Sequence, residues 1–171
     1  MPEPVDFHDF VAARRKRLLR SAWLLTGDWA AAEDLVQTAL VRCYPHWRRI
    51  ATDNPDAYVR RTLFNTYASW RRRRWHGELS TADLPQQPAE GDQYAAADER
   101  HRLLSALDRL PARQRATLVL RYFEDLSERD TAVALDCSVG TVKSQTAKAL
   151  AHLRTSGVLL DPHQENEVAH D

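Results

Sequence analysis

The sequence is poor in the residues and runs that mark several classes of protein. Its two cysteines form neither a CxxC motif nor a Cys/His ligand spacing, so we expect no disulfide framework and no metal site. Five glycines and no glycine-rich loop argue against a nucleotide-binding sheet protein. No apolar run reaches the roughly 18 residues that span a bilayer, and the first ten residues lack a signal peptide's apolar core. We therefore expect a cytoplasmic protein without cofactors.

A net charge of zero hides a strong polarity along the chain. Lys and Arg together number 24, as do Asp and Glu. Residues 41–75 nevertheless hold nine arginines against two aspartates, whereas residues 76–98 hold five acids and no Lys or Arg. A basic block followed by an acidic connector predicts that one part of the chain binds a polyanion.

Apolar residues recur at helical spacing along most of the chain, and no segment shows the alternation of a strand. Proline, glycine and capping residues divide this pattern. The predicted helices cover about 5–25, 28–44, 54–75, 98–110, 111–123, 127–135 and 138–154.

The helices group into two small domains, which predicts an all-α fold. The N-terminal helical domain would cover 5–75, and the C-terminal helix-turn-helix domain would cover 98–156. Residues 76–97 are expected to form a flexible acidic linker, because they hold Gln, Pro and acids without an apolar stripe. The polar residues 157–171 are expected to form a disordered tail.

The last two predicted helices are short and joined by a tight turn, as in a helix-turn-helix. On the final helix, Val139, Val142, Leu150 and Leu153 share the face that would pack on the core. The opposite face would read the major groove, since Gln pairs with adenine, Lys reaches guanine, and a flanking Lys suits a phosphate. Its candidates are Thr141, Lys143, Ser144, Gln145 and Lys148. Spacing alone leaves a protein-binding module open as an alternative.

The predicted helix over 54–75 combines arginines with aromatic residues, the groups that bind single-stranded nucleic acid. Arginines neutralise phosphates, and exposed aromatic rings stack on unpaired bases. Tyr67 and Trp70 lie on the apolar stripe and are expected in the core, whereas Tyr58 is better placed for exposure. The run Arg71–Arg74 favours a nucleic-acid partner, because four adjacent cations repel each other without a counter-charge. A solvated basic face remains the alternative.

Four stretches resemble, in order, motifs of bacterial RNA polymerase sigma factors. The first is Ala-Glu-Asp-Leu-Val-Gln at 32–37, and the second runs from Asn54-Pro-Asp-Ala-Tyr58 to the arginine run. Leu110-Pro-Ala-Arg-Gln-Arg115 resembles the start of their C-terminal domain, and Val139-Gly-Thr-Val-Lys-Ser144 resembles their recognition helix. The chain lacks the extra domains of a housekeeping sigma factor, so it resembles the two-domain extracytoplasmic-function (ECF) type.

The resemblance implies a role for each part. The helix over 28–44 would dock on the coiled coil of the polymerase beta-prime subunit through Glu33, Asp34 and Gln37. The helix over 54–75 would capture bases of the minus-ten element, helped by the loop before it, where a pocket could hold one extruded base. Promoter melting and single-strand binding would rest on Arg48, Asn54, Tyr58, Arg60, Arg61, Asn65, Arg71, Arg72, Arg73 and Arg74. The final helix would read the minus-thirty-five element.

The resemblance also implies partners and leaves two alternatives. Core RNA polymerase, through its beta-prime and beta subunits, and promoter DNA would be the partners, and an anti-sigma factor is a further candidate. No catalytic residue is expected. A helix-turn-helix regulator acting on duplex DNA without polymerase would leave the first half without a role. A nucleic-acid enzyme would need clustered carboxylates, but the adjacent Glu33 and Asp34 diverge by about 100° around a helix.

The length of the linker limits how far apart the two domains can bind on DNA. As a free coil, the 23 residues of 76–98 would span roughly 25–30 Å. Promoter elements one and a half helical turns apart are separated by roughly 50 Å. We therefore expect polymerase to hold the linker extended.

Overall fold

The computed structural model describes residues 3–75 and 94–157, and within them every regular element is helical. The helices are α1 (Phe7–Thr26), α2 (Trp29–Cys43), α3 (Trp47–Ile50), α4 (Pro55–Trp75), α5 (Tyr94–Asp108), α6 (Ala112–Leu118), α7 (Glu128–Leu135) and α8 (Val139–Thr155). A 3-10 turn, η1 (Tyr44–His46), precedes α3, and a π-helical segment, η2 (Val119–Phe123), continues α6. Most of the expected linker and tail, 76–93 and 158–171, lies outside the described residues. Helix α5 begins four residues earlier than expected, at Tyr94.

Side-chain caps begin the helices where the sequence predicts them. In each case a side-chain oxygen accepts the backbone N–H three residues on, at 3.0–3.1 Å, which satisfies one of the unpaired donors of a helix start. The caps are Asp28 on α2, Asn54 on α4, Ser127 on α7 and Ser138 on α8. At the other end of α1, Gly27 adopts φ 74° and donates its N–H to the Trp23 carbonyl, 2.7 Å away.

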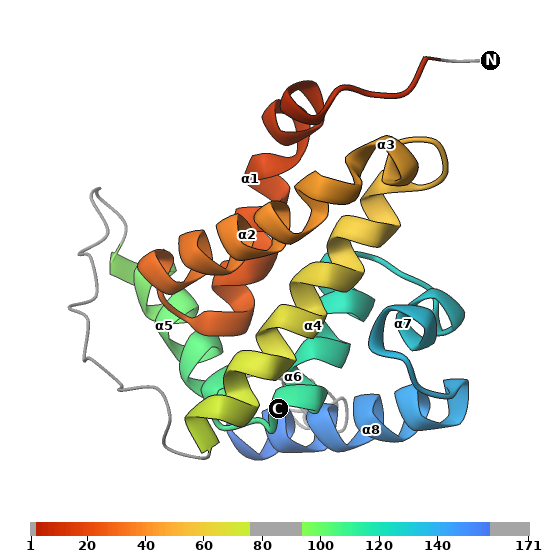
Figure 1. Ribbon diagram of the computed structural model, residues 1–171. Coiled ribbons are helices and arrows are strands. Elements are labelled where there is room, and N and C mark those ends of the chain that lie inside the picture. Colours follow the sequence, from red (N-terminus) through yellow and green to blue (C-terminus); the bar gives the residue numbers. More distant parts are fainter. Residues whose placement is uncertain (1–2, 76–93, 158–171) are drawn as a thin grey trace, which may run out of the picture.

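The N-terminal half is built from α1, α2 and α4, which pack side by side (Figure 1). The buried face of α4 carries Val59, Leu63, Phe64 and Tyr67. The predicted burial of Tyr67 is confirmed, and Trp70 is half-buried at the edge of the same core. This core therefore holds α4 in place while the side that carries Tyr58 and Arg61 stays exposed.

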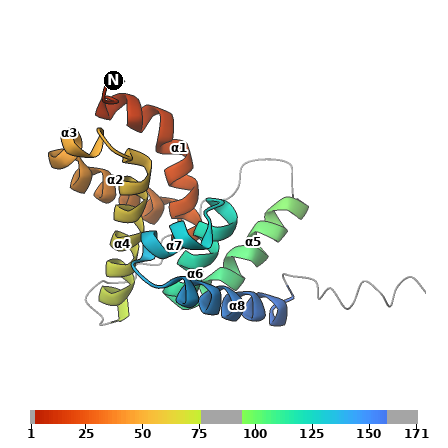
Figure 2. The same cartoon turned by 90° about the vertical axis from the view of Figure 1, so that its right-hand side faces the viewer.

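The C-terminal half surrounds the rod formed by α6 and η2. Leu118, Val119 and Leu120 are buried there, and both α7 and α8 pack against the rod (Figure 2). Helices α7 and α8 meet at a turn in which Asp136 adopts the left-handed conformation, φ 52°. Asp tolerates that conformation better than most residues, so the predicted helix-turn-helix is formed.

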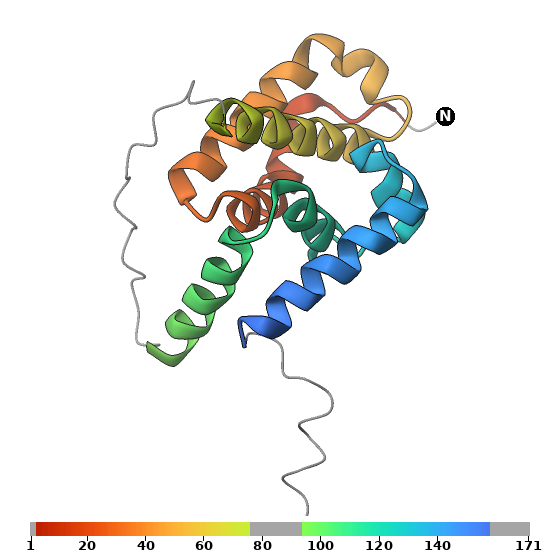
Figure 3. The same ribbon diagram turned by 90° about the horizontal axis from the view of Figure 1, so that it is seen from below.

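The two halves pack against each other, which the sequence analysis does not foresee. Helix α4 contacts α6 and α7, and α1 contacts η2 (Figures 1 and 3). A contiguous cluster of buried apolar side chains extends from Phe10 on α1 to Leu153 on α8. The two predicted helical domains thus share one core in this conformation.

Two apolar residues differ from their expected positions. Trp29 has the helical spacing of the buried Ala32 and Val36, three and seven residues on, yet it is exposed and stacks on Trp23 with ring centroids 5.2 Å apart. Val139, expected to face the core, is exposed because it is the first residue of α8, ahead of the turn that packs.

None of the helices within 3–75 and 94–157 is long and apolar enough to cross a bilayer.

The two cysteines differ in accessibility, which predicts their reactivity. Burial raises the pKa of the Cys43 thiol, an effect that a hydrogen bond with Thr62 only partly offsets. Because the thiolate is the nucleophile, Cys43 should react slowly at pH 8, while the half-buried Cys137 reacts faster. Titration with a chromogenic disulfide should count one fast thiol in the native chain and two after unfolding. Two fast native thiols would contradict the packing of α2.

Candidate nucleic-acid interface

Helix α8 presents its predicted reading face at the surface. Lys143, Ser144 and Lys148 are exposed, and Thr141 and Gln145 are half-buried. The opposite side of the helix is anchored by Val142, Ala149 and Leu153, all buried. The helix lies along the outside of the C-terminal half (Figure 3), so the face is available to a DNA groove.

Two of these side chains also have partners within the helix-turn-helix. The Thr141 hydroxyl lies 2.9 Å from that of Ser138, the α8 cap. Lys143 Nζ lies 3.8 Å from Glu128 Oε2 on α7, an exposed pair that adds little stability. A phosphate could therefore replace this carboxylate at low cost, and Lys148 has no ion pair among those found in the described part of the chain.

Helix α4 carries a stripe of polar and aromatic side chains opposite its core face. Tyr58, Arg61, Asn65 and Arg72 follow steps of three, four and seven, so they lie on one side of the helix, and all four are exposed. Arg73 is exposed and Arg71 half-buried, while the side chain of Arg74 is outside the described part. The predicted pairing of cations with an exposed ring is present at the surface.

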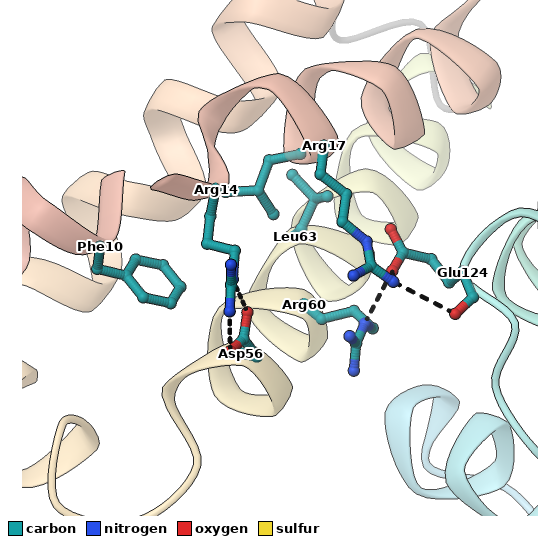
Figure 4. A pocket seen from close by; sticks show the side chains of 8 residues that line it. Phe10, Arg14, Arg17, Asp56, Arg60, Leu63 and Glu124 are labelled. Carbon is teal, nitrogen blue, oxygen red and sulfur yellow. Dashed lines mark hydrogen bonds and ion pairs between the residues drawn. The ribbon is translucent and has the colours of Figure 1, made fainter. Parts of the chain in front are cut away.

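Arg60 is the exception among the predicted α4 residues. Its side chain is only 18% exposed, and its Nε lies 3.4 Å from the Oε2 of Glu124, just after η2. This arginine, predicted to contact DNA, is therefore occupied by a carboxylate of the C-terminal half (Figure 4).

The stretch 48–54 begins as helix and ends as the predicted loop: residues 48–50 belong to α3, and 51–54 form the turn that leads into α4. Arg48 lies on α3, where it is exposed. The Asn54 side-chain oxygen is used to cap α4, accepting from the Ala57 N–H at 3.1 Å. The described residues show a pocket elsewhere, between α1 and α4, and it reaches Glu124 (Figure 4).

Charged groups line that pocket. Arg14 donates to both carboxylate oxygens of Asp56, at 2.6 and 3.3 Å. This hydrogen bond, together with the attraction of the carboxylate, raises the pKa of the Arg14 guanidinium. The pair ties α1 to the start of α4 and so helps orient the helix that carries the basic stripe.

Helix α2 presents Glu33, Asp34 and Gln37 to solvent, as predicted. Two large apolar side chains missed by the sequence analysis continue this face: Val41 is 64% exposed and Tyr44 is 60% exposed. Their spacing from Gln37, four and then three residues, is the signal that could have found them. A polar face that continues into exposed apolar groups suits a protein partner.

Within 3–75 and 94–157, no three His, Cys, Asp or Glu side chains gather as metal ligands would.

Two family models match this sequence. Residues 10–77 match the one described as "Sigma-70 region 2", and residues 100–153 match "Sigma-70, region 4". The first match covers α1 to α4, and the second covers most of the C-terminal half.

Two curated relatives are similar along most of their length. The RNA polymerase sigma-E factor of Streptomyces coelicolor is 42% identical over 162 residues, 94% of this chain and 91% of that protein. The ECF RNA polymerase sigma factor SigL of Mycobacterium tuberculosis is 33% identical over 143 residues, 80% of each protein.

Two solved structures have a similar fold. One is the sigma factor RpoE of Bartonella quintana, crystallised with the anti-sigma factor NepR, at a TM-score of 0.70 and 25% identity. That match covers 88% of this chain and 96% of the other. The other structure is CnrH with the cytosolic domain of CnrY, at a TM-score of 0.61 and 23% identity over 87% and 85% of the two chains.

Proposed function

The chain belongs to the extracytoplasmic-function sigma factors of RNA polymerase, and we propose that its three exposed faces divide the work of transcription initiation. The acidic face of α2 docks on core polymerase. The basic stripe of α4 holds melted bases of the minus-ten element, and α8 reads the minus-thirty-five element in the major groove. The observation that carries this proposal is the presence of all three faces, in this order, on one chain.

The division of the chain follows from these roles. We assign core binding and promoter melting to residues 5–75 and upstream-element reading to residues 98–156. On α2, the negative charge of Glu33 and Asp34 suits a coiled coil flanked by cations, and Val41 and Tyr44 extend the contact with apolar area. On α4, Tyr58 stacks on a base while Arg61 and Arg72 neutralise phosphates.

The factor acts by binding energy rather than by chemistry. Bases held out of the stack offset the few kcal/mol needed to unstack them, so no catalytic group is required and the chain is not an enzyme. It works in the cytoplasm, where polymerase and DNA are. A relative of this fold was crystallised with an anti-sigma factor, and a partner of that kind is a candidate here.

A regulator that binds duplex DNA alone is the weaker candidate. It explains α7 and α8 but gives no role to the exposed acidic face of α2 or to the aromatic and basic stripe of α4. Such a regulator would also leave unexplained why residues 10–77 match the family model of sigma-70 region 2.

Run-off transcription tests the function directly. Core polymerase should start transcripts at defined promoters when the purified chain is added, and should start none there without it. Promoters found by mapping transcript starts after overexpression of the chain supply the templates. Equal transcription with and without the chain would refute the proposal.

Replacing Lys148 or Gln145 with alanine should change which upstream elements are used. Each contact to a base edge contributes roughly 1–3 kcal/mol of discrimination. The preference for the best upstream element over its competitors should therefore fall by about 5- to 150-fold. Competition between promoters that differ only at the upstream element measures this ratio. Lys143→Ala is the control: as a phosphate contact, it should weaken all elements alike. A uniform loss for Lys148→Ala would place that residue on the backbone instead.

A further inference from the structure

Glu124 is a buried carboxylate whose side-chain partners all come from the other half of the protein. Its side chain is 5% exposed. The Ser21 hydroxyl on α1 donates to Oε1. Arg17 Nη2 and Arg60 Nε lie 3.2 and 3.4 Å from Oε2 (Figure 4). A buried charge is tolerated only when it is paired, so this contact depends on the two halves being together.

A second charged residue, on the rod that precedes Glu124, makes a matching contact. Arg115 on α6 is fully buried and donates from Nε to the Leu24 carbonyl at 2.7 Å. Leu24 lies in the last turn of α1, where carbonyls lack a partner within the helix and attract positive charge. Arg115 also pairs with Asp108 at 2.8 Å within its own half. The rod and the residue that follows it thus contact α1 at two points.

The backbone around Glu124 is built in an uncommon way. The Glu124 N–H donates to the Val119 carbonyl at 2.9 Å, which closes the π-helical segment η2, and Asp125 then adopts φ 54°. π-helical turns are rare and occur mostly at functional sites. The extra residue of such a turn redirects the side chains that follow it, and here it sets the direction of Glu124.

The packed conformation cannot serve both promoter elements at once. Helix α7, which belongs to the upstream-element reader, contacts α4, which carries the single-strand stripe. The two elements are roughly 50 Å apart on DNA, whereas helices in contact have axes about 10 Å apart. In addition, Arg60 is held by Glu124 and is not free for DNA.

We propose that Glu124 is an intramolecular latch: its carboxylate, bound by Arg17, Ser21 and Arg60, holds the two halves closed until core polymerase separates them. This inference rests on the proposed function, since it supposes that the open form is the active one. Opening exposes Glu124 to water and frees Arg60 on the face of α4. The latch therefore keeps the chain from occupying DNA without polymerase.

Energy transfer between dyes on the two halves measures the opening. Cysteines placed at the exposed Ala13 on α1 and Ala151 on α8 carry the dyes, with Cys137→Ser, while Cys43 stays buried. Glu124→Gln keeps the shape and removes the charge. It should raise the ratio of open to closed molecules by about tenfold, the size of one lost charge-assisted hydrogen bond. Asp125→Asn removes the same charge from the exposed neighbour and should leave the ratio unchanged.

A second variant keeps the latch testable if Glu124→Gln does not fold. Arg17 is 57% exposed, so Arg17→Gln removes one partner of Glu124 without disturbing the core and should shift the ratio in the same direction by less. If Glu124→Gln loses its cooperative thermal transition, the energy transfer measured in Arg17→Gln decides whether the latch exists. Unchanged transfer in the folded latch variants, or an equal shift in Asp125→Asn, would overturn the latch.

The same samples separate this inference from the function on which it rests. Core polymerase should lower the transfer in the wild-type chain, and Glu124→Gln should still support run-off transcription. A chain that opens in the variants but never supports initiation would keep the latch and refute the sigma-factor roles. If the chain initiates normally but its variants do not open, the latch is refuted and the sigma-factor roles stand.

Discussion

Replacing Arg71–Arg74 with alanine is expected to slow the opening of promoter DNA far more than it weakens binding of the closed duplex. These residues lie in the last turn of α4, where Arg72 is the final member of the exposed stripe that begins at Tyr58. In the proposed function they meet the strands only once these have separated, so their contribution is expected to fall on the melting step. A loss of roughly 1–3 kcal/mol there slows opening by about 5- to 150-fold. A fluorescent base analogue in the minus-ten element reports the rate, and anisotropy of labelled duplex reports closed binding.

A matched removal of charge controls for the general attraction to DNA. Four exposed arginines of the C-terminal half can be replaced with alanine to give the same change in net charge: Arg100, Arg102, Arg109 and Arg113. This variant should open promoters at close to the normal rate once bound. An equal loss of duplex binding and opening rate in the α4 variant would show that the run serves only as a nonspecific anchor.

Reversing the charge of α2 should abolish the association with core polymerase. Glu33 and Asp34 are exposed, so replacing both with lysine leaves the core intact while it brings cations against a partner selected for anions. Juxtaposed like charges cost several kcal/mol, which lowers the affinity by about 100-fold or more. Titration of labelled chain with core polymerase measures the change.

The control for this experiment is a second acidic pair. Asp98 and Glu99 are adjacent and exposed on α5, and their replacement with lysine gives the same net charge in the other half. That variant should bind polymerase almost normally. If both pairs reduce the affinity equally, polymerase responds to total charge, and the docking face is not on α2.

The helices could be predicted from sequence because their signals are local. Capping side chains such as Asp28 and Ser138 bond to the backbone three residues on, so the residue types alone indicate the helix starts. Apolar spacing likewise predicts the buried face of α4, and Arg61 and Asn65 are exposed as expected. Periodicity fails only at a helix end, as at Val139.

The packing between the halves could not be predicted, because it joins residues far apart in the chain and includes buried charged groups as well as apolar ones. Glu124 and Arg115 belong to residue types that are almost never buried unless they are paired, and their partners lie about 100 residues away in the chain. No local pattern links them. The π-helical segment at Val119–Phe123 also gives no signal in the sequence, because an apolar run predicts a continuous α-helix whether or not one turn is widened.

Binding of labelled promoter duplex should be measured with the chain alone, with core polymerase alone and with both together. We expect weak binding by the chain, binding by core polymerase that ignores sequence, and a strong preference for the intact promoter only when both are present. If the chain alone shows the same sequence preference as the complex, its two halves select DNA without polymerase, and the proposed function is wrong.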